Sequence, residues 1–566
     1  MSASAWFSPF LPERRIGTIT RVQATTASAN LPDAAHLSGR QLFGSRIGAG
    51  ELGEFVFIEC GELAVFGRIV ETTLSLSDRL SVETKLGHIA QTSPFGTIHL
   101  LTTIVVETGE IRRGIVRHPR LGAQVFAADS RLVKSIVEGR GDGKIKRLIE
   151  LAELPETGAT KINFEPEHMF GRHCAVLGAT GGGKSWTVAK LTEEIARNKG
   201  KAILIDATGE YHRTPAKHIF VGERGPLEPT TSTEVVFPYS LLLEDDLFAI
   251  FRPSPGVQAP KLREAIKSLK LARVDPTPFA GDNGCVVKSG KSVKYLDDLF
   301  RKYKGSLANP TADFDIKLLS EQIRLECFKP FVNNGAFGGP DESAFGYCIS
   351  LINRIDSYLS TADLSFLFDP GSKMTIPVAI EQFLCDSSCH DLRISLEGVP
   401  FGVNAREILV NAIGRKLLSL ARSGRFRKCP VIALLDEAHQ FLNKHIGDEF
   451  LQVHLDAFSL VAKEGRKYGL SAVIATQRPR DIPEDVLSQM GTMIVHRLVS
   501  HFDRETVERA SGEIDRGAAA FLPVLGQGEA LMIGVDFPLP LAIKIIPPDA
   551  PPESKGPDFQ NSWAAA

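Results

Sequence analysis

The sequence predicts an α/β fold, in which a mainly parallel sheet follows a small antiparallel β domain and is interrupted by a helical insertion. Three observations predict it. Short apolar segments rich in Val, Ile and Thr are separated by Gly or Pro over residues 15–130. A strand, an amphipathic helix and a second strand follow one another between Cys174 and Ile205, which is the repeating unit of a parallel sheet. The same rhythm resumes after residue 405.

Residues 1–135 are predicted to form the N-terminal β domain. Their apolar segments are short, and the Gly and Pro residues between them indicate tight turns. This spacing is typical of antiparallel strands in a small barrel, with a sandwich as the alternative. The segments read RIGTITRV, EFVFIEC, LAVFGRIVE, TIHLLTTIVVE and AQVFAA.

Residues 136–214 are predicted to be the first part of the α/β core. Cys174–Leu177 is an apolar run with the length of a buried strand, and Ala202–Ile205 is a second one. Between them, apolar residues recur at helical spacing until Gly200 ends the helix. These residues are Trp186, Val188, Ala189, Leu191, Ile195 and Ala196.

Residues 215–400 are predicted to form a largely helical insertion, with helices over Asp315–Phe328 and Ser343–Leu359. Within it, residues 261–304 hold 11 Lys or Arg against 5 Asp or Glu, whereas the whole chain has a net charge of -2. This local positive charge has two interpretations. It is either a surface for a polyanion or a partner, or the solvated face of helices.

Residues 401–545 are predicted to complete the α/β core. Residues 546–566 are rich in Pro, and we expect them to run extended over a surface, where such a tail could clasp a neighbouring subunit. The predicted elements of the core are a helix over Asn404–Ala421, a strand at Val431–Leu435, a helix near Asp448–Lys467, and strands at Ser471–Ala475 and Thr492–His496.

The composition bounds the class of protein. A chain of 566 residues is long enough for several domains, and 43% hydrophobic with 23% charged residues is typical of a soluble globular protein. Eight irregularly spaced cysteines indicate neither a disulfide framework nor a zinc ribbon, and we interpret Cys385, Cys389 and His390 as not binding a metal. No targeting segment is evident, and no apolar run reaches the roughly 18 residues that cross a bilayer. We therefore expect a cytoplasmic protein without membrane contact.

The run Gly178–Ser185 reads GATGGGKS and lies between a predicted strand and a predicted helix. Its glycines allow backbone N–H groups to turn inward onto a phosphate. Lys184 can neutralise the β and γ phosphates, and Ser185 opens the helix with its hydroxyl toward a magnesium ion. The pattern predicts binding of ATP with Mg²⁺. The predicted nucleotide-binding residues of this segment are Gly178, Ala179, Thr180, Gly181, Gly182, Gly183, Lys184, Ser185 and Thr187.

Two adjacent carboxylates, Asp436 and Glu437, follow the apolar strand Val431–Leu435. Ligands of open α/β sheets bind at the carboxyl ends of the strands. Asp436 is predicted to hold the magnesium through its water shell, and Glu437 is predicted to polarise the attacking water as general base. The alternative is a charge pair at a helix N-terminus.

Other polar residues follow neighbouring strands. Gln477, in VIATQRP, is predicted to sense the γ-phosphate, with an ordinary strand-end turn as the alternative. Asp206 and Glu210 are assigned to nucleotide binding through the metal shell or the water, with loop capping as the alternative.

Phosphoryl transfer also needs positive charge at the γ-phosphate, and ring motors commonly take an arginine from the adjacent subunit. Arg466, in KEGRKYG, is the first candidate, with complementation of a helix dipole as the alternative. Arg172, in GRH before the first core strand, is the second, with an exposed structural arginine as the alternative.

These segments together resemble the HerA family of hexameric DNA translocases, within the HerA and FtsK group of motors. The resemblance implies a RecA-like (ASCE) P-loop NTPase core, a HAS-type barrel at the N-terminus and a clasping C-terminal tail. It also implies that Lys184 and Ser185 bind ATP and magnesium, that Asp436 and Glu437 serve hydrolysis, and that Gln477 senses nucleotide. Arg172 and Arg466 lie where the family places its inter-subunit arginines. The segments that carry the resemblance are GATGGGKS, ILIDATGEYH, ALLDEAHQF, AKEGRKYGL and VIATQRP.

The resemblance further implies a homo-hexamer that threads duplex DNA through its pore. Such a motor usually works with a nuclease, or with a sirtuin-like or other effector in antiphage defence. Two functional hypotheses follow. The first is an ATPase that translocates on or unwinds duplex DNA, and the second is an ATP-ordered ring scaffold that assembles and activates a partner effector without processive translocation.

Overall fold

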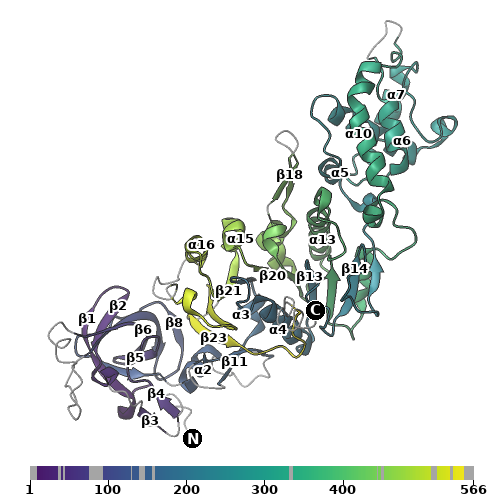
Figure 1. The fold of residues 1–566 in the computed structure, drawn as a ribbon. Helices are drawn as coiled ribbons and strands as arrows, with labels where there is room; N and C mark the ends of the chain where they lie inside the picture. The colour runs from purple at the N-terminus through teal and green to yellow at the C-terminus, as the bar shows by residue number, and fades with distance from the viewer. Residues whose placement is uncertain are drawn as a thin grey trace, which may run out of the picture. The chain divides into compact units, whose positions relative to one another are not determined.

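The structure, a computed structural model, describes residues 9–35, 40–42, 45–74, 94–128, 130–138, 147–155, 160–329, 335–442, 444–447, 452–511, 519, 521–535 and 540–553. The chain divides into two compact units (Figure 1). Unit 1 comprises Met1–Gly200 and Ser471–Pro552, and unit 2 comprises Lys201–Leu470 and Glu553–Ala566. The tail predicted at 546–566 lies outside the described residues beyond Glu553.

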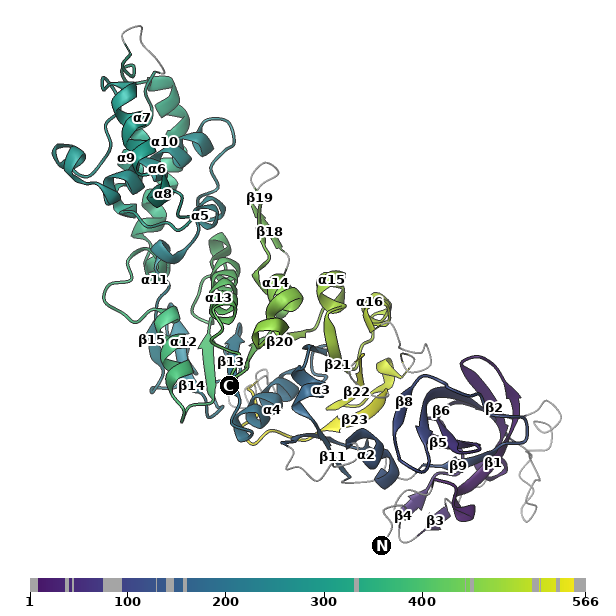
Figure 2. The ribbon, with the colours of Figure 1, turned by 180° about the vertical axis from the view of Figure 1, so that it is seen from behind.

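Unit 1 begins with the β-barrel that the sequence predicts. Six antiparallel strands close on themselves, because β2 pairs with β1 on one side and with β7 on the other, while β8 (Ile111–Arg113) extends β7. Figure 2 shows these strands curving around a shared interior. The core of this domain includes the apolar side chains Ile16, Val56 and Val65. The strands are β1 (Arg15–Val22), β2 (Thr26–Asn30), β5 (Phe55–Cys60), β6 (Leu63–Thr73), β7 (Phe95–Val105) and β9 (Gln124–Ala127), and a separate hairpin contains β3 (Arg40–Leu42) and β4 (Ser45–Ile47).

Unit 1 continues with a mixed sheet in the order β11-β10-β23-β22-β21-β12-β20. β12 lies between β20 and β21 and is parallel to both, and all five of its residues are buried, as expected for a strand covered on both faces. The strands are β10 (Ile149–Glu153), β11 (Lys161–Phe164), β12 (His173–Leu177), β20 (Leu470–Thr476), β21 (Met490–His496), β22 (Glu529–Ile533) and β23 (Leu541–Ile545). The helices are α2 (Ser130–Glu138), α3 (Pro166–Phe170), α4 (Lys184–Arg197), α15 (Glu484–Leu487) and α16 (His501–Ser511).

Unit 2 contains a parallel sheet in the order β17-β13-β16-β14-β15. Its strands are β13 (Lys201–Asp206), β14 (Lys217–Val221), β15 (Thr233–Val235), β16 (Asp391–Ser395) and β17 (Val431–Leu435), with helices α12 (Ile376–Cys385), α13 (Ala405–Arg422) and α14 (Ala457–Glu464). The prediction of a largely helical insertion over 215–400 was too broad, because β14, β15 and β16 belong to the sheet. Their apolar runs are short and far apart in the sequence, so that local periodicity alone did not separate them from the helices.

The helical part of the insertion, residues 239–368, is called the helical module. The helix predicted at Ser343–Leu359 is α10. In the stretch Asp315–Phe328, the Asp315 side chain accepts from the Lys317 N–H and caps a 3₁₀ turn, which leads directly into the short helix α9. Figure 2 shows α6 beside α9, in agreement with their packing. The helices are α5 (Glu244–Phe251), α6 (Gln258–Val274), α7 (Val293–Lys302), α8 (Lys304–Leu307), α9 (Leu319–Leu325), α10 (Glu342–Ser360) and α11 (Ser365–Phe368).

The helix predicted near Asp448–Lys467 was wrong in its first half. A hairpin of β18 (Lys444–Gly447) and β19 (Gln452–Leu455) precedes it, and α14 begins only at Ala457. The Asn411 side chain in α13 accepts a hydrogen bond from the Ala457 N–H at 2.9 Å, which caps the helix at that point. This cap comes from a residue 46 positions away and is invisible to local periodicity.

Among the described residues, no helix combines the length and the apolar character that crossing a bilayer requires.

Candidate nucleotide site

The phosphate loop, residues 178–185, joins the carboxyl end of β12 to α4 and is held at several points. The Gly178 N–H donates to the Thr476 carbonyl at 3.3 Å, and the Ala179 N–H donates to the Arg497 carbonyl at 2.9 Å. The Gly182 carbonyl accepts from the Gly528 N–H at 3.1 Å. The last residue of β20, the residue after β21 and the residue before β22 therefore fix the path of the loop.

The loop residues fit a polyanionic ligand. Gly181 has φ +76°, and a Cβ built there would meet nothing within 4 Å, so this side of the loop is open. Gly183, with φ +118°, precedes the first turn of α4, whose free N–H groups and dipole favour an anion. Lys184 is buried with its Nζ 3.3 Å from the Ala179 carbonyl, and Ser185 is half-buried in the same turn. Backbone amides, an ammonium group and a hydroxyl form the donor set that nucleotide phosphates require.

Two further predicted residues contact this loop. Gln477 follows β20, and its Oε1 accepts a hydrogen bond from the Thr180 hydroxyl at 2.5 Å. Thr187 lies one turn into α4, where its hydroxyl is 2.8 Å from His496 Nε2. The fold thus joins Gln477 to the loop across 297 residues of sequence.

His496, at the end of β21, was not identified from the sequence. Burial lowers the pKa of its imidazole to about 4, with the neighbouring Lys184 ammonium as a further cause. The only sequence signal is a histidine at the end of the apolar strand MGTMIVH, which by itself does not indicate a contact with the loop.

In unit 2, Asp436 and Glu437 follow the carboxyl end of β17, as predicted. Asp436 is 4% exposed, and its N–H donates to the Ile205 carbonyl at 3.2 Å. Burial, followed by the negative charges of Asp206, Glu437 and Glu210, raises the pKa of Asp436 well above its usual value. This crowding of carboxylates would be relieved by a bound cation.

The carboxylates near Asp436 suit a magnesium ion that is held partly by water and phosphate, and not an ion enclosed by protein ligands alone. No group of three or more His, Cys, Asp or Glu side chains within the described ranges could hold an ion by itself. Mg²⁺ commonly binds through one or two carboxylates together with water and substrate phosphates, so a single carboxylate such as Asp436 is compatible with it.

Glu437 has a left-handed backbone with φ +48°, which is uncommon for a residue other than glycine. Its Oε2 lies 3.2 Å from His439 Nδ1. Both side chains are largely buried, and His439 is a residue that the sequence analysis did not single out. Residues held in such sparsely populated backbone conformations cluster at active sites, which agrees with the role predicted for Glu437.

Asp206 is engaged by donors on both oxygens. Its Oδ1 accepts from the Thr208 and Gly209 N–H groups at 3.2 and 2.8 Å, and its Oδ2 accepts from the Tyr211 N–H at 3.1 Å and from Arg393 Nε at 2.7 Å. This arrangement favours the loop-capping alternative for Asp206.

Arg393, in β16, is fully buried and also binds Glu228 at 2.8 Å, so that it ties two carboxylates together. Sequence reasoning missed it, because a single arginine within an apolar strand carries no motif.

Glu210 is tied to the end of the described chain. Its carbonyl accepts from the Glu553 N–H at 2.9 Å, and the Glu553 carboxylate lies 2.6 Å from Arg213 and 3.2 Å from His212. The segment after β13 and the first residue of the C-terminal part of unit 2 therefore form one contact region.

Of the two candidate arginines, Arg172 belongs to unit 1 and Arg466 to unit 2. Arg466 is exposed in the 3₁₀ turn Gly465–Tyr468 that follows α14, and Arg172 is half-buried immediately before β12.

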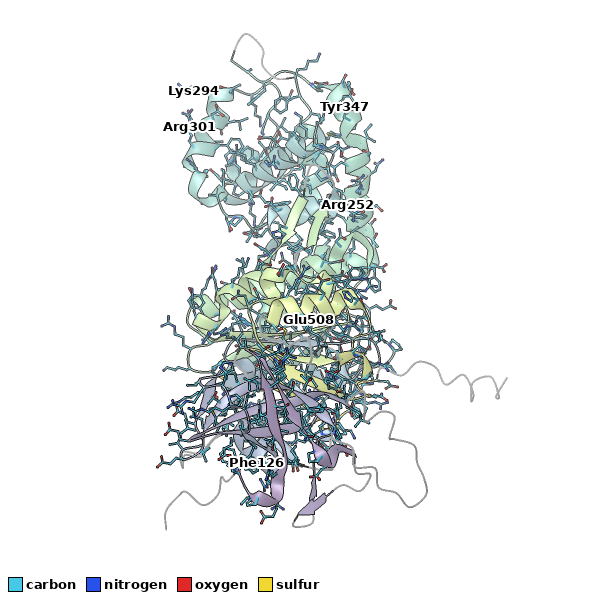
Figure 3. The ribbon with its side chains drawn as sticks, turned by 90° about the vertical axis from the view of Figure 1, so that its left-hand side faces the viewer. Phe126, Arg252, Lys294, Arg301, Tyr347 and Glu508 are labelled. Atoms are coloured by element: carbon cyan, nitrogen blue, oxygen red, sulfur yellow. The ribbon has the colours of Figure 1, made fainter. Side chains whose placement is uncertain are left out.

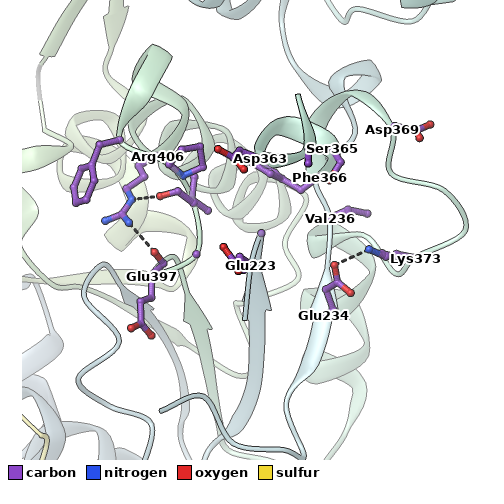
Figure 4. A pocket seen from close by; sticks show the side chains of 16 residues that line it. Glu223, Glu234, Val236, Asp363, Ser365, Phe366, Asp369, Lys373, Glu397 and Arg406 are labelled. Carbon is purple, nitrogen blue, oxygen red and sulfur yellow. Dashed lines mark hydrogen bonds and ion pairs between the residues drawn. The ribbon is translucent and has the colours of Figure 1, made fainter. Parts of the chain in front are cut away.

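A cavity of about 620 Å³ in unit 2 is distinct from the predicted residues (Figure 4). It lies at the end of the sheet where β14 and β15 are found, and Glu223, Asp363 and Glu397 line it. Lys373 pairs with Glu234 at 2.6 Å, and Arg406 donates to main-chain carbonyls. Because carboxylates outnumber cations on its walls, this cavity does not suit a phosphate group.

Two family models of known proteins match this chain, one over each part of the predicted α/β core. The family model "Helicase HerA, central domain" matches residues 149–298, and the model "Helicase HerA-like C-terminal" matches residues 415–536. A probable helicase of Methanocaldococcus jannaschii is 25% identical over 511 residues, covering 88% of this chain and 86% of the relative. The DNA double-strand break repair helicase HerA of Saccharolobus solfataricus is 26% identical over 454 residues, covering 79% and 76%. Among solved structures, the plasmid coupling protein TrwB in complex with a non-hydrolysable ATP analogue matches 75% of this chain and 92% of that chain, with 15% identity and a TM-score of 0.42.

Proposed function

The chain belongs to the HerA family of ATP-dependent helicases, and we propose that it hydrolyses ATP to move along or unwind duplex DNA as a ring of six identical subunits. The observation that carries the proposal is the phosphate loop. It is fixed to the ends of β20 and β21, presents an open glycine at Gly181, and leads into the N-terminus of α4 at Lys184.

In the proposed reaction, the loop amides and the Lys184 ammonium bind the phosphates of ATP and offset their negative charge. Glu437 accepts a proton from the attacking water as general base. Gln477 is suited to report the state of the γ-phosphate to the loop, because it already contacts Thr180.

Ser185 and Asp436 are the residues that would hold magnesium, which supplies charge stabilisation to the phosphoryl group when bound. Arg466 and Arg172 are proposed to act on nucleotide of an adjacent subunit. Their support is the family resemblance, together with the exposure of Arg466 in its turn.

Steady-state ATPase measurements with and without duplex DNA test the proposal. Lys184→Ala is expected to weaken ATP binding, and Glu437→Gln is expected to lower kcat by about 10²- to 10⁴-fold while ATP still binds. Lys428→Ala, at an exposed position after α13, is the matched control and should behave as wild type. DNA-independent turnover in the wild type, or full turnover in Glu437→Gln, would contradict the proposal.

We also propose that the motor works with a separate nuclease-type or sirtuin-like effector, in DNA processing or antiphage defence. The support is that the motifs identified in this chain are those of a motor and none is that of a nuclease. Affinity purification of the native protein with ATP and Mg²⁺, followed by mass measurement, should yield a ring with a second protein. Recovery of the chain without a second protein would count against an effector.

The Glu437→Gln variant also distinguishes the translocation hypothesis from the scaffold hypothesis. If ATP only orders the ring, Glu437→Gln should still assemble and activate the partner although translocation is lost. If translocation is the function, partner activity should fall together with ATP turnover.

A further inference from the structure

His496 lies where the phosphate loop leaves the sheet. It is the last residue of β21, and its side chain is fully buried. β21 runs parallel to β12 in a register that sets Val495 beside Leu177. His496 is therefore level with Gly178, the first glycine of the loop. It also contacts Thr187 in α4, from which 309 positions separate it in the sequence.

Three loop glycines pack directly on this side chain. A Cβ built on Gly178 would lie 2.6 Å from His496 Cβ, and one built on Gly182 would lie 3.3 Å from the same atom. A Cβ on Gly183 would lie 3.1 Å from His496 Cε1. These glycines are thus required by close approach to the imidazole as well as by their backbone angles. The histidine forms the surface against which the loop is shaped.

Hydrogen bonds fix the orientation of the ring. His496 Nδ1 lies 2.9 Å from the Glu529 carbonyl, and because a carbonyl only accepts, Nδ1 carries the proton. Nε2 then has a lone pair, and the Thr187 hydroxyl lies 2.8 Å from it. The Thr187 hydroxyl also lies 3.1 Å from the Gly183 carbonyl, which receives the Thr187 N–H as well. If the hydroxyl proton pointed to that carbonyl, lone pairs of the hydroxyl oxygen and of Nε2 would face each other at 2.8 Å, so the proton is assigned to the contact with the imidazole.

The geometry points to His496 as a positioning residue of the phosphate loop: through Glu529 and Thr187 it holds the loop glycines in the nucleotide-binding shape before nucleotide arrives. This inference rests on the proposed function, in that the loop binds ATP. The neutral form of the ring, which burial favours by lowering its pKa to about 4, is the form that can accept from Thr187.

A histidine that only filled the core would contribute stability without affecting the nucleotide. A positioning residue instead preorganises the loop, so that its loss weakens ATP binding while bound nucleotide still reacts. The two roles are separated by comparing KM with kcat, and by comparing substitutions that break one hydrogen bond at a time.

The experiment uses the full-length protein with His496→Asn, Thr187→Val and Thr187→Ser. His496→Asn can keep a donor for Glu529 but cannot reach Thr187. It is expected to raise the KM for ATP and the Kd of a fluorescent ATP analogue about tenfold or more, with kcat changed by less than about threefold. Thr187→Val should shift both constants in the same direction, and Thr187→Ser, which keeps the hydroxyl, should shift them clearly less than Thr187→Val. His496→Asn combined with Thr187→Val should be no worse than the more severe single variant.

Ile494→Val is the matched control, because Ile494 is also fully buried and lies on the same face of β21 two residues earlier. It should lower the unfolding midpoint without changing KM. Unchanged KM and Kd in His496→Asn, with only the midpoint lowered, would overturn the inference. Should the His496 variants not fold, equal affinities of Thr187→Val and Thr187→Ser would do the same. A wild-type protein that does not bind the analogue would instead reject the proposed function.

Discussion

Asp436 and Asp391 are both buried aspartates of the unit 2 sheet, and they lie at opposite ends of its parallel strands. Asp436 follows the carboxyl end of β17, whereas Asp391 is the first residue of β16, which is parallel to the other strands. Burial raises the pKa of both carboxyl groups. Only Asp436 lies at the edge where ligands of parallel sheets bind, so the two should respond differently to substitution.

Asp391→Asn should stabilise the protein in alkaline but not in acidic solution. Burial raises the pKa of Asp391 to about 7, although the Lys201 ammonium partly opposes the shift, and its Oδ1 is buried without a hydrogen bond. Because the folded pKa is above the unfolded value, the stability present below pH ~4 is lost as the pH rises through ~7. The variant should gain up to about 4 kcal/mol relative to wild type at pH 8 and little at pH 4.

Thermal unfolding midpoints across this pH range measure the effect. The control is Asp386→Asn, since Asp386 is an exposed carboxylate that accepts from Ser388 and whose pKa is lowered by that contact. A difference between Asp391→Asn and wild type that does not grow with pH would contradict the assignment.

Asp436→Asn should raise the thermal stability of the ligand-free protein and remove its activity. The variant relieves repulsion with Glu437, Asp206 and Glu210, which together with burial raises the pKa of Asp436, so the gain should appear as the pH rises through that raised pKa. ATP turnover should fall at least about a hundredfold, because the proposed magnesium carboxylate is lost. Unfolding midpoints should also show that Mg²⁺ with a non-hydrolysable ATP analogue stabilises the wild type and not the variant.

At the scale of elements, α13 and α14 pack closely through a glycine. A Cβ on Gly414 of α13 would lie 3.0 Å from Ala457 Cβ and from the Phe458 ring in α14. In α10, by contrast, a Cβ on Gly346 would meet nothing within 4 Å. The same residue type therefore serves helix packing in one place and has no steric role in the other.

The substitution of alanine should have opposite effects at these two glycines. Gly414→Ala should lower the unfolding midpoint, because overpacking costs roughly 1–3 kcal/mol. Gly346→Ala should raise it, since alanine favours a helix interior by about 0.5–1 kcal/mol. Each variant serves as the control for the other in the same melting experiment. A raised unfolding midpoint in both variants would show that intrinsic helix propensity outweighs the contact between α13 and α14.

At the scale of the whole molecule, most of the positively charged side chains of residues 261–304 make contacts within the helical module. Nine of its eleven Lys and Arg side chains contact carboxylates, main-chain carbonyls or aromatic rings within the helical module. Lys270 and Lys288, for example, are buried against Glu244 and Glu326. Figure 3 shows Lys294 and Arg301 at the surface of the module. These contacts favour an intramolecular role over a polyanion surface.

The expected outcome is that Lys294→Glu combined with Lys304→Glu leaves DNA binding unchanged. Both lysines are exposed. If they contacted phosphates, the double variant would reduce the slope of log affinity against log salt by about two. Titration of duplex DNA at several salt concentrations measures the slope. A reduced slope would instead favour the hypothesis that this region binds DNA.

The sequence by itself determined the parts of the site that depend on neighbours along the chain. The strand, glycine loop and helix around Lys184, the carboxylate pair after β17 and the antiparallel β character of the N-terminal domain all follow from local periodicity and turn residues. These patterns are visible because each element needs its own apolar face and its own breaks.

Only the tertiary structure decided which distant residues meet. In the folded chain, His496 packs against the loop glycines and Arg393 forms an ion pair with Asp206. Strands β14, β15 and β16, which lie within the predicted insertion, belong to the sheet. Helix α14 begins where the Asn411 side chain caps it. The physical reason is that strand register and side-chain hydrogen bonds between distant segments depend on packing of the whole sheet, which local periodicity does not encode.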